Sequence, residues 1–238
     1  MRITIIGYGK MGKEVENIAL SRGHEVILRI DRDNIHDFDS ELFAASDTAI
    51  EFTTPETAFD NISRCIKKDI PVVSGTTGWT GKLDLIRKLV ETEGGTLLYA
   101  SNFSIGVNIL FDLNRKLAAL MNKLPGYKVS IEEIHHAMKK DAPSGTAINL
   151  AEDIINECAR YESWKQDKPS DKECVGIKSL REGQVTGTHR IDWTSDIDTI
   201  TLQHMAHNRK GFALGAVFAA EYIRNRKGVF TMNDLLGF

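Results

Sequence analysis

The 238-residue chain is long enough for one large α/β domain or two compact ones, and its 42% hydrophobic and 26% charged residues are ordinary for a globular protein. Thirty Lys and Arg residues against thirty-three Asp and Glu residues give a formal net charge of −3, without a dense basic run, which argues against nucleic acid as a partner. No apolar stretch approaches the roughly 18 residues of a membrane span, so we expect no membrane partner.

The amino-terminal sequence and the cysteines both favour a cytoplasmic protein. "MRITIIGYGKMG" leads straight into an apolar run and lacks the cationic region, long apolar region and cleavage site of a secretory signal. Cys65, Cys158 and Cys174 are odd in number and widely separated, without a CxxC pair. This pattern is typical of free thiols in a reducing compartment rather than of a disulfide framework or a zinc site.

The first hundred residues alternate between short β-rich runs and longer segments with helical periodicity. Parallel strands need crossover connections that follow one hand, so this alternation predicts a doubly wound, Rossmann-type α/β fold with a parallel sheet covered on both faces. We expect strands within residues 2–7, 24–30, 47–53, 70–76 and 95–101, and helices over 10–22, from Pro55 onward and over 80–93.

The pattern changes after residue 104. We expect a long amphipathic helix through Leu110 and Leu120, a strand at 127–134, a helix ending near Ala159, a polar surface loop at 160–173, and strands at 175–181, 187–195 and 198–206. These strands predict an antiparallel or mixed sheet, and therefore a second, α+β domain at residues 105–209. Residues 1–104 and 210–238 would form the first domain, with the alanine-rich helix near 211–228 returning to cover its sheet.

Gly7, Gly9 and Gly12 form a G-x-G-x-x-G motif between a predicted strand and a predicted helix. In a dinucleotide-binding loop the first glycine makes the tight turn, the second admits the pyrophosphate to the backbone, and the third lets helix and strand pack closely. Asp31 follows the second predicted strand, where a carboxylate binds a ribose diol. The combination predicts a dinucleotide site, although a tight turn in a domain that binds another nucleotide, or none, would show the same glycines.

Arg32 leaves the choice between NADH and NADPH open. A guanidinium at this position could stack on adenine or pair with a 2′-phosphate, whereas Asp31 would repel that phosphate. Two further loops, at Gly75–Gly78 and Ala100–Phe103, follow predicted strands and should reach the same edge of the sheet. They are placed to contact the nicotinamide half of a cofactor, or they are ordinary turns.

The stretch "EIHHAMKKDAPSGTAINLAE" contains two adjacent histidines, His135 and His136, followed by Lys139 and Lys140. In an extended segment neighbouring side chains point to opposite faces, so the two imidazoles would serve different purposes. One is suited to donate a proton near neutral pH, while the other contacts a different part of a ligand. Such histidine pairs also occur as structural or surface residues, and adjacent lysines are commonly solvated.

Pro143 suits the first turn of a helix, and Ser144, Gly145 and Thr146 would then present backbone N–H groups and hydroxyls at its amino-terminal end. That end favours a carboxylate or phosphate, although the same residues would also fit a plain turn and cap. Acid, cation and helix end together indicate a reductase of an anionic unsaturated substrate. We predict no metal, because carboxylate or cysteine ligands at zinc spacing are missing.

The segment "EIHHAMKKDAPSGTA" resembles the signature of the dihydrodipicolinate reductase family, also called 4-hydroxy-tetrahydrodipicolinate reductases, of diaminopimelate and lysine biosynthesis. The resemblance extends through "GKMG", "GTTG", "SNFSIGVN", the strands around Gly183 and Gly187, and "NRKGFALGA", so it covers nearly the whole chain. It implies reduction of a cyclic dicarboxylate imine with NADH or NADPH. It also implies that the second domain binds substrate and assembles a homotetramer, with a hinge closing the two domains over the ligands.

Carried over residue by residue, the resemblance makes His135 the principal proton donor and Lys139 a second donor or a substrate anchor. His136, Gly145 and Thr146 would hold the substrate together with Ser144 at the predicted helix end, and Arg209 is a further candidate contact. The implied cofactor-binding residues are Gly7, Tyr8, Gly9, Lys10, Met11, Gly12, Asp31, Arg32, Gly75, Thr76, Thr77, Ala100, Ser101, Asn102 and Phe103.

The sequence departs from many family members around the cofactor. Its glycine loop is one residue shorter, with Lys10 where many have Arg, and Thr54 replaces an Arg, which removes a cation. The chain is also shorter before Asp47, so the first domain is expected to lack an element. Two rival functions remain: another Rossmann dehydrogenase, acting on a semialdehyde or sugar acid, which leaves the His-His-x-x-Lys and Ser-Gly-Thr cluster unexplained, and a nucleotide-sensing module that binds without turnover.

Overall fold

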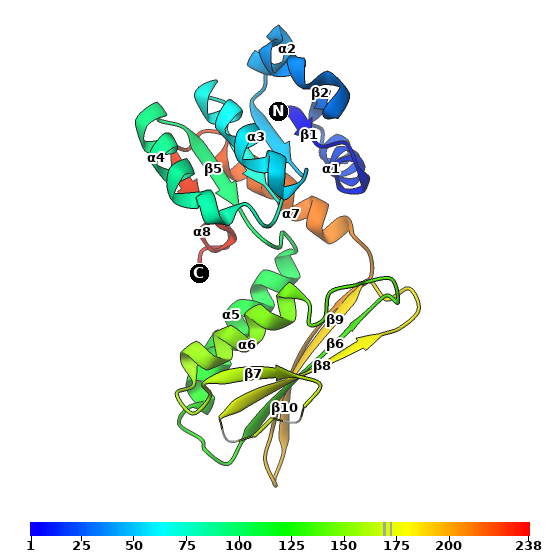
Figure 1. The fold of residues 1–238 in the computed structure, drawn as a ribbon, viewed down its shortest axis with the longest axis vertical. Coiled ribbons are helices and arrows are strands. Elements are labelled where there is room, and N and C mark those ends of the chain that lie inside the picture. The colour runs from blue at the N-terminus through cyan, green and yellow to red at the C-terminus, as the bar shows by residue number, and fades with distance from the viewer. Residues whose placement is uncertain (169, 172) are drawn as a thin grey trace. The chain divides into compact units, whose positions relative to one another are not determined.

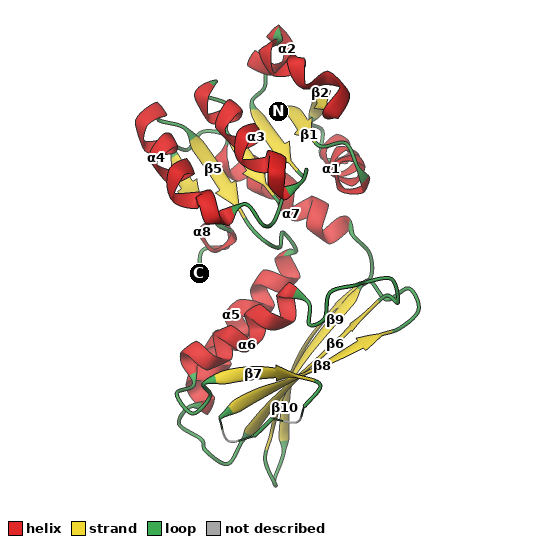
Figure 2. Cartoon of the chain, in the orientation of Figure 1, coloured by secondary structure: helices red, strands yellow, loops and turns green. Residues whose placement is uncertain are grey.

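The structure is a computed structural model that describes residues 1–168, 170–171 and 173–238, and the chain divides into two compact units. The first unit contains Met1–Ile105 and Lys210–Phe238, and the second contains Gly106–Arg209. Each unit has its own β-sheet and its own buried hydrophobic clusters. The elements are labelled in Figure 1 and coloured by type in Figure 2.

The first unit is built on a six-stranded parallel sheet with the order β11-β5-β4-β3-β1-β2. Its strands are β1 (Arg2–Ile6), β2 (Glu25–Ile30), β3 (Thr48–Glu51), β4 (Val72–Ser74), β5 (Thr96–Tyr99) and β11 (Gly228–Phe230). The predicted Rossmann-type sheet is confirmed, and β11 is an edge strand that the sequence pattern did not predict. The chain changes direction across the sheet between β1 and β3, and such switch points are where ligands of doubly wound sheets bind.

Helices cover both faces of this sheet (Figure 2). Successive strand side chains point to opposite faces, so Ile5 of β1 joins one buried cluster and Ile6 joins the other. The helices α1 (Lys10–Ser21) and α7 (Lys210–Ile223) contribute to the first cluster, and α3 (Pro55–Lys67) and α4 (Leu83–Glu93) contribute to the second. The predicted return of the alanine-rich helix to the first sheet is therefore confirmed.

The connection from β2 to β3 is short. It consists of the 3-10 helix η1 (Arg32–Asp39) and the single-turn helix α2 (Glu41–Ala44). Phe38 and Phe43 anchor it to the core through a T-shaped contact, with ring centroids 5.1 Å apart. Since residues 31–47, all of which the structure describes, form no further strand, β2 remains the edge of the sheet. Two shorter elements, η2 (Thr80–Lys82) and α8 (Met232–Leu236), complete the unit.

The second unit has a mixed sheet, as predicted, and its five strands have the order β10-β9-β6-β8-β7. The central strand β6 pairs antiparallel with β9 and parallel with β8. The helices α5 and α6 pack against the sheet through a cluster that includes Leu150 and the fully buried Trp193. The elements are α5 (Ile105–Met121), β6 (Lys128–His135), α6 (Gly145–Glu157), β7 (Ser163–Gln166), β8 (Cys174–Arg181), β9 (Gly187–Thr194) and β10 (Thr199–Ala206).

Two local predictions in this unit are wrong. The expected loop over residues 160–173 contains the strand β7, whose pairing with β8 needs backbone groups only and whose side chains, apart from the partly buried Trp164, are exposed. An exposed edge strand therefore has the polar composition of a loop. Pro143 does not lie in the first turn of a helix, because Ser144 is the N-cap and α6 begins at Gly145.

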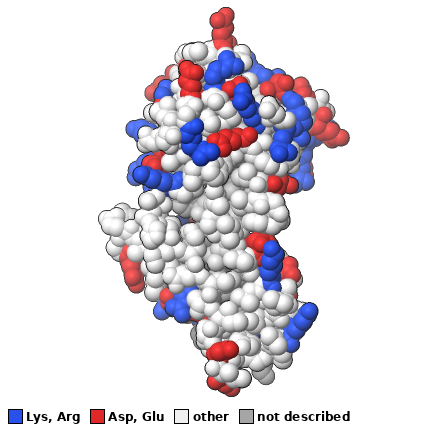
Figure 3. Space-filling model, turned by 180° about the vertical axis from the view of Figure 1, so that it is seen from behind, with Lys and Arg blue, Asp and Glu red and all other residues white. Residues whose placement is uncertain are grey.

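On the face shown in Figure 3, positive and negative side chains are interspersed rather than gathered into one large patch of a single sign. Among the helices of the described residues, none combines the length and apolar character that a membrane crossing requires.

Candidate active site

The second sheet has a polar end on its helix-covered face. Along β6 the inward-facing residues change from the apolar Ile131 to the polar Glu133 and His135. Strand pairing places Ser179 of β8 and His189 of β9 on either side of Glu133. Polar side chains from three strands therefore meet where the hydrophobic core ends.

Glu133 is fully buried and accepts several contacts. Its Oε1 accepts hydrogen bonds from the backbone N–H of Ser144 at 3.0 Å and from Nη2 of Arg181 at 3.1 Å. Its Oε2 lies 3.3 Å from Nδ1 of His135. Burial by itself would raise the pKa of Glu133, but polar contacts with His135, Ser144 and Ser179 outweigh it and hold the pKa well below its usual range. The group therefore remains a carboxylate.

His189 is a neutral neighbour of this carboxylate. Burial, followed by the nearby charge of His135, lowers the pKa of His189 to about 3. Its Nε2 lies 3.2 Å from Oγ of Ser144, which also accepts the backbone N–H of Ala147 as the cap of α6. The hydroxyl and Nε2 share one hydrogen bond, whose direction is set by the tautomer of the His189 ring. The rings of His189 and His135 form a T-shaped pair 5.1 Å apart.

The amino-terminal end of α6 is partly open. Gly145 is exposed, and a Cβ added there would meet no atom within 4 Å, while Thr146 is half-buried. Ser144, in contrast, is buried, and its hydroxyl and backbone N–H both make internal hydrogen bonds. The backbone at Gly145 and Thr146 is thus the part of this helix end that is suited to bind an anion.

The loop after β6 positions the remaining candidates. The backbone N–H of Lys139 donates to the carbonyl of His136 at 3.1 Å, which closes a turn directly after the strand. Nζ of Lys139 pairs with Asp141 at 2.7 Å, and this hydrogen bond is the main cause of a lowered pKa of Asp141. A partly exposed pair of this kind contributes at most about 1 kcal/mol, so Lys139 can exchange Asp141 for a ligand carboxylate at small cost. Arg209 is exposed at the end of the second unit.

Ligand atoms of Glu133, His135 and His189 lie within 4.8 Å of one another, a spacing short enough for a metal ion. The guanidinium of Arg181, however, already binds the same carboxylate. A positive group at this position disfavours a divalent cation and favours a cluster that holds protons. We therefore assign no metal to these residues.

In the first unit, the glycine loop has the geometry that a dinucleotide site requires. Gly7 has φ +89°, and a Cβ there would lie 2.0 Å from the carbonyl oxygen of Phe52. A Cβ at Gly12 would lie 2.2 Å from the carbonyl oxygen of Gly7, which shows how closely helix and strand pack. Gly9 is the N-cap of α1, and a Cβ there would meet nothing within 4 Å. The loop therefore leaves a helix end open to a pyrophosphate, and it fits the predicted nicotinamide cofactor.

Asp31 lies directly beside this loop. Its carboxylate accepts hydrogen bonds from the backbone N–H groups of Tyr8, at 3.2 Å, and Arg32, at 2.8 Å. The side chain is exposed at the end of β2, where a cofactor ribose would lie. The hydroxyl of Tyr8 contacts Glu16, which in turn contacts Arg29, so the loop is also tied to β2 through side chains.

A cavity of about 460 Å³ opens at the switch point of the first sheet. Beneath it lies Glu51, a fully buried carboxylate at the end of β3. It accepts hydrogen bonds from the backbone N–H of Thr53 at 3.0 Å and from the hydroxyls of Ser74 at 2.6 Å and Thr76 at 2.8 Å, and also contacts the hydroxyl of Thr53. It therefore joins two loops of the cavity. The lining residues are Gly9, Lys10, Met11, Phe52, Thr53, Pro55, Gly75, Thr76 and Thr77.

The segment Ala100–Phe103 is not part of the lining of that cavity, as far as the described residues define it. Phe103 is buried, and its ring packs edge-on against Phe52 with centroids 6.0 Å apart. A Cβ at Gly215 of α7 would lie 1.8 Å from the carbonyl oxygen of Phe103, so the helix holds this segment closely. A cofactor contact by these residues stays a prediction and would involve Ala100–Asn102 or the backbone.

Sequence reasoning missed Glu133, Arg181, His189 and Glu51. The period of two in strands was a usable signal for Glu133, since it lies two residues before His135 and must share its face. Arg181 and His189 belong to other strands, and their approach depends on a pairing register that the sequence does not display. Glu51 was missed because a single acidic residue in the run "TAIEFT" is typical of a strand end that faces solvent.

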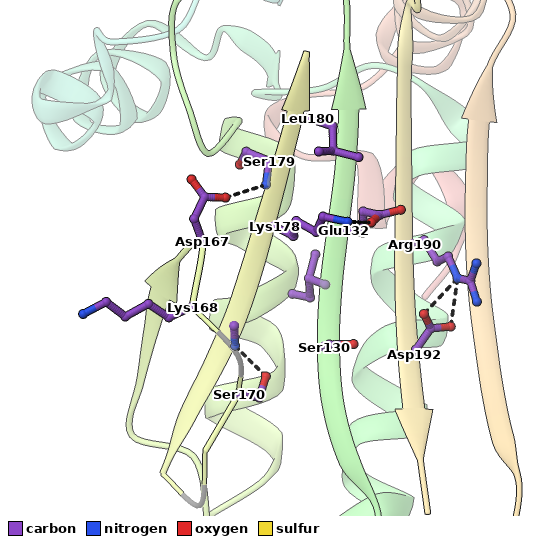
Figure 4. A pocket seen from close by; sticks show the side chains of 12 residues that line it. Ser130, Glu132, Asp167, Lys168, Ser170, Lys178, Ser179, Leu180, Arg190 and Asp192 are labelled. Carbon is purple, nitrogen blue, oxygen red and sulfur yellow. Dashed lines mark hydrogen bonds and ion pairs between the residues drawn. The ribbon is translucent and has the colours of Figure 1, made fainter. Parts of the chain in front are cut away.

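A second cavity, of about 660 Å³, lies on the opposite, open face of the second sheet (Figure 4). Four of its charged side chains form two ion pairs, as Figure 4 shows: Lys178 with Glu132 at 2.9 Å, and Arg190 with Asp192 at 2.8 Å. Asp167 accepts the backbone N–H of Ser179 at 3.1 Å. These charges neutralise one another, so we assign no catalytic group to this face.

Comparison with known families identifies both parts of the chain. Residues 1–103 match the family model described as "Dihydrodipicolinate reductase, N-terminus", and residues 106–236 match "Dihydrodipicolinate reductase, C-terminus". The match to the C-terminal family model also includes α7, a helix that follows the second unit in the chain but belongs to the first unit in the fold.

Individual relatives agree with the family models. The chain is 46% identical over 236 residues to 4-hydroxy-tetrahydrodipicolinate reductase of Christiangramia forsetii, covering 99% of this chain and 98% of the relative. It is 35% identical to the enzyme of the same name from Neisseria meningitidis, over 93% of this chain and 84% of that one. The dipicolinate-bound dihydrodipicolinate reductase from Paenisporosarcina sp. TG-14 superimposes with a TM-score of 0.76 at 27% identity, covering 97% of both chains.

Proposed function

The chain belongs to the dihydrodipicolinate reductase family, and from this membership we propose that it reduces 4-hydroxy-tetrahydrodipicolinate, or its dehydrated form, to tetrahydrodipicolinate in diaminopimelate and lysine biosynthesis. The observation that carries the proposal is the pair of Glu133 and His135 next to the open end of α6, in a chain that also has a dinucleotide loop. A proton donor beside an anion-binding helix end is what reduction of a dicarboxylate imine needs.

NADH or NADPH, when bound, supplies the hydride. The loop Gly7–Gly12 would hold the pyrophosphate, and Asp31 the adenosine ribose. Arg32 would stack on the adenine or pair with a 2′-phosphate, which keeps both cofactors in the proposal. The loops Gly75–Thr77 and Ala100–Phe103 would contact the nicotinamide half.

The second unit would bind and protonate the substrate. The backbone N–H groups of Gly145 and Thr146 and the ammonium of Lys139 suit the two substrate carboxylates, with His136 and Ser144 as further contacts. Addition of hydride moves an electron pair toward the ring nitrogen, which then needs a proton. His135 would donate it, a contribution of about 10²–10⁴ in rate, and Lys139 is the second candidate donor.

Assembly and location complete the proposal. We expect a cytoplasmic homotetramer that assembles through the second unit, whose open sheet face offers paired charges and the cavity of Figure 4 to a second copy. Cys65, Cys158 and Cys174 are buried free thiols, which suits a reducing compartment. Light scattering of the purified protein tests this assembly, since a monomeric mass would exclude it.

The decisive experiment follows absorbance at 340 nm with enzymatically generated substrate precursor. Oxidation of NADH or NADPH supports the reductase, whereas cofactor binding without oxidation supports a nucleotide sensor. We expect His135→Ala to lower kcat at least about tenfold with little change in cofactor affinity. The exposed His36 offers a matched control, because His36→Ala should leave kcat unchanged.

Lys139 is tested against its neighbour in the same loop. Lys139→Ala should raise KM for the substrate by roughly tenfold and also lower kcat, since a charge-assisted hydrogen bond is worth about 1.5–3 kcal/mol. Lys140→Ala is the matched control, because Lys140 is an exposed cation one residue away. Unchanged kinetic constants for Lys139→Ala would remove this residue from the substrate site.

A further inference from the structure

We propose that Glu133 is a positioning residue that accepts a hydrogen bond from Nδ1 of His135 and so reserves Nε2 of that imidazole for proton delivery. The inference rests on the proposed role of His135 as proton donor. It assigns to the donor a tautomer and a delivering atom, neither of which follows from the sequence motif.

The orientation of Glu133 is fixed independently of His135. Ser144 and Arg181 both donate to Oε1, and the side chain is fully buried, so the carboxylate has little freedom to rotate. Oε2 thereby lies 3.3 Å from Nδ1 of His135; both atoms are buried, and in the described part of the chain neither makes a hydrogen bond of good geometry, so each is left for the other. A carboxylate whose orientation is fixed also fixes the orientation of the imidazole that donates to it, as in other carboxylate–histidine pairs.

Nε2 of His135 lies next to Gly187 on β9. A Cβ added at Gly187 would lie 3.1 Å from Nε2, closer than ordinary van der Waals contact, so the glycine leaves room for the ring in this orientation. Nδ1 of His135 is therefore directed to Glu133, and Nε2 is the nitrogen that remains for a ligand.

The other charged and titratable groups around His135 do not compete for this contact. Arg181 on β8 binds the same carboxylate, His189 on β9 is neutral, and Lys139 in the following loop pairs with Asp141. His204 on the outer strand β10 faces His189. Within the described part of the chain, Glu133 is the only carboxylate within 4 Å of the His135 ring nitrogens.

The proton balance follows from this geometry. The protonated ring gives its Nε2 proton to the substrate nitrogen, and the N–H bonding electrons stay on Nε2 as a lone pair. The proton on Nδ1 stays in its hydrogen bond to Glu133. After the transfer, the His135 imidazole is therefore neutral and protonated only on Nδ1. Solvent returns a proton to Nε2 before the next turnover.

The test compares Glu133→Gln with the wild-type protein in two measurements. In spectra of ¹⁵N-histidine-labelled protein without ligands, we expect a hydrogen-bonded Nδ1 proton on His135 that the variant loses. In steady-state kinetics, we expect a tenfold or larger fall in kcat/KM. Glu152→Gln is the matched control, since Glu152 is an exposed glutamate on α6 of the same unit. It should change neither signal.

The outcomes separate this inference from the proposed function. If His135→Ala leaves kcat unchanged, the proposed proton donor is wrong, whatever the Glu133 variant does. If His135→Ala impairs turnover while Glu133→Gln keeps both the Nδ1 proton and the wild-type kcat/KM, the positioning role alone is overturned. Should the Glu133 variant fail to fold, the wild-type spectrum still decides, because a neutral ring protonated on Nε2 would contradict the proposal.

Discussion

Glu51 in the first unit and Glu133 in the second are both fully buried carboxylates, one at the end and the other near the end of a central strand. The partners of Glu51 are uncharged: one backbone N–H and the hydroxyls of Thr53, Ser74 and Thr76. The partners of Glu133 include the guanidinium of Arg181 and the imidazole of His135. One site thus offers an acceptor to neutral donors, and the other offers a negative charge to groups that carry or exchange protons.

This difference corresponds to two kinds of task. A cofactor loop needs a fixed shape, and hydrogen bonds from uncharged donors around a buried acceptor supply it. A proton donor needs a neighbour whose charge acts on its protonation, and only an ionised partner does this. The comparison therefore predicts that removing the charge at position 133 changes stability and activity more than removing the charge at position 51.

The largest expected difference is in stability. Glu133→Gln leaves the mostly buried Arg181 without its carboxylate, and we expect a loss of roughly 3 kcal/mol, as for other broken buried pairs. Glu51→Gln keeps an acceptor for its neutral donors and should cost less than about 1 kcal/mol. Thermal unfolding of the two variants at neutral pH measures the contrast. Equal losses would show that the two carboxylates play the same structural part.

A second difference is in the response to acid. The pKa of His189 is about 3 in the folded protein but near 6.5 in the unfolded chain, so the unfolded state binds more protons between these values. The contribution of His189 to stability must then fall with decreasing pH, by roughly 1.4 kcal/mol for each pH unit between 6.5 and about 3. We expect His189→Gln to remove this slope. Fluorescence of a Trp79→Phe protein, in which only Trp164 and Trp193 of the second unit remain, reports the unfolding.

Asp153 contributes a pH dependence of the opposite sign, which that experiment must separate from the contribution of His189. Burial raises the pKa of Asp153 on α6 to about 6, so protonation of this group stabilises the folded state as the pH falls through the same range. The two groups therefore oppose each other, and only the difference between His189→Gln and the unsubstituted histidine isolates the His189 contribution. An unchanged slope in the variant would mean that His189 is already charged in the folded protein.

The two regions also differ in how far the sequence predicted them. The glycine loop and Asp31 were predictable because strand, turn and helix follow one another in the chain, and the crossover rule brings their ends to one edge. The cluster around Glu133 was not, since it depends on β6 pairing parallel with β8 and antiparallel with β9. The sequence motif predicted His135, Lys139 and Gly145 as site residues, but it gave no sign of Arg181 or His189, which lie 46 and 54 residues after His135.

The smallest expected effect concerns cofactor affinity in Glu51→Gln. The amide oxygen can take the place of Oε1, which accepts the backbone N–H of Thr53 and the hydroxyl of Thr76. The amide nitrogen then faces the hydroxyl of Ser74, which can turn and accept because a hydroxyl has both a donor and acceptor sites. Since the cavity loops keep their anchor, the Kd for NADH, measured by fluorescence titration, should change less than about threefold. A tenfold loss would mean that the negative charge of Glu51 itself shapes the cofactor site, and the contrast between the two carboxylates would no longer hold.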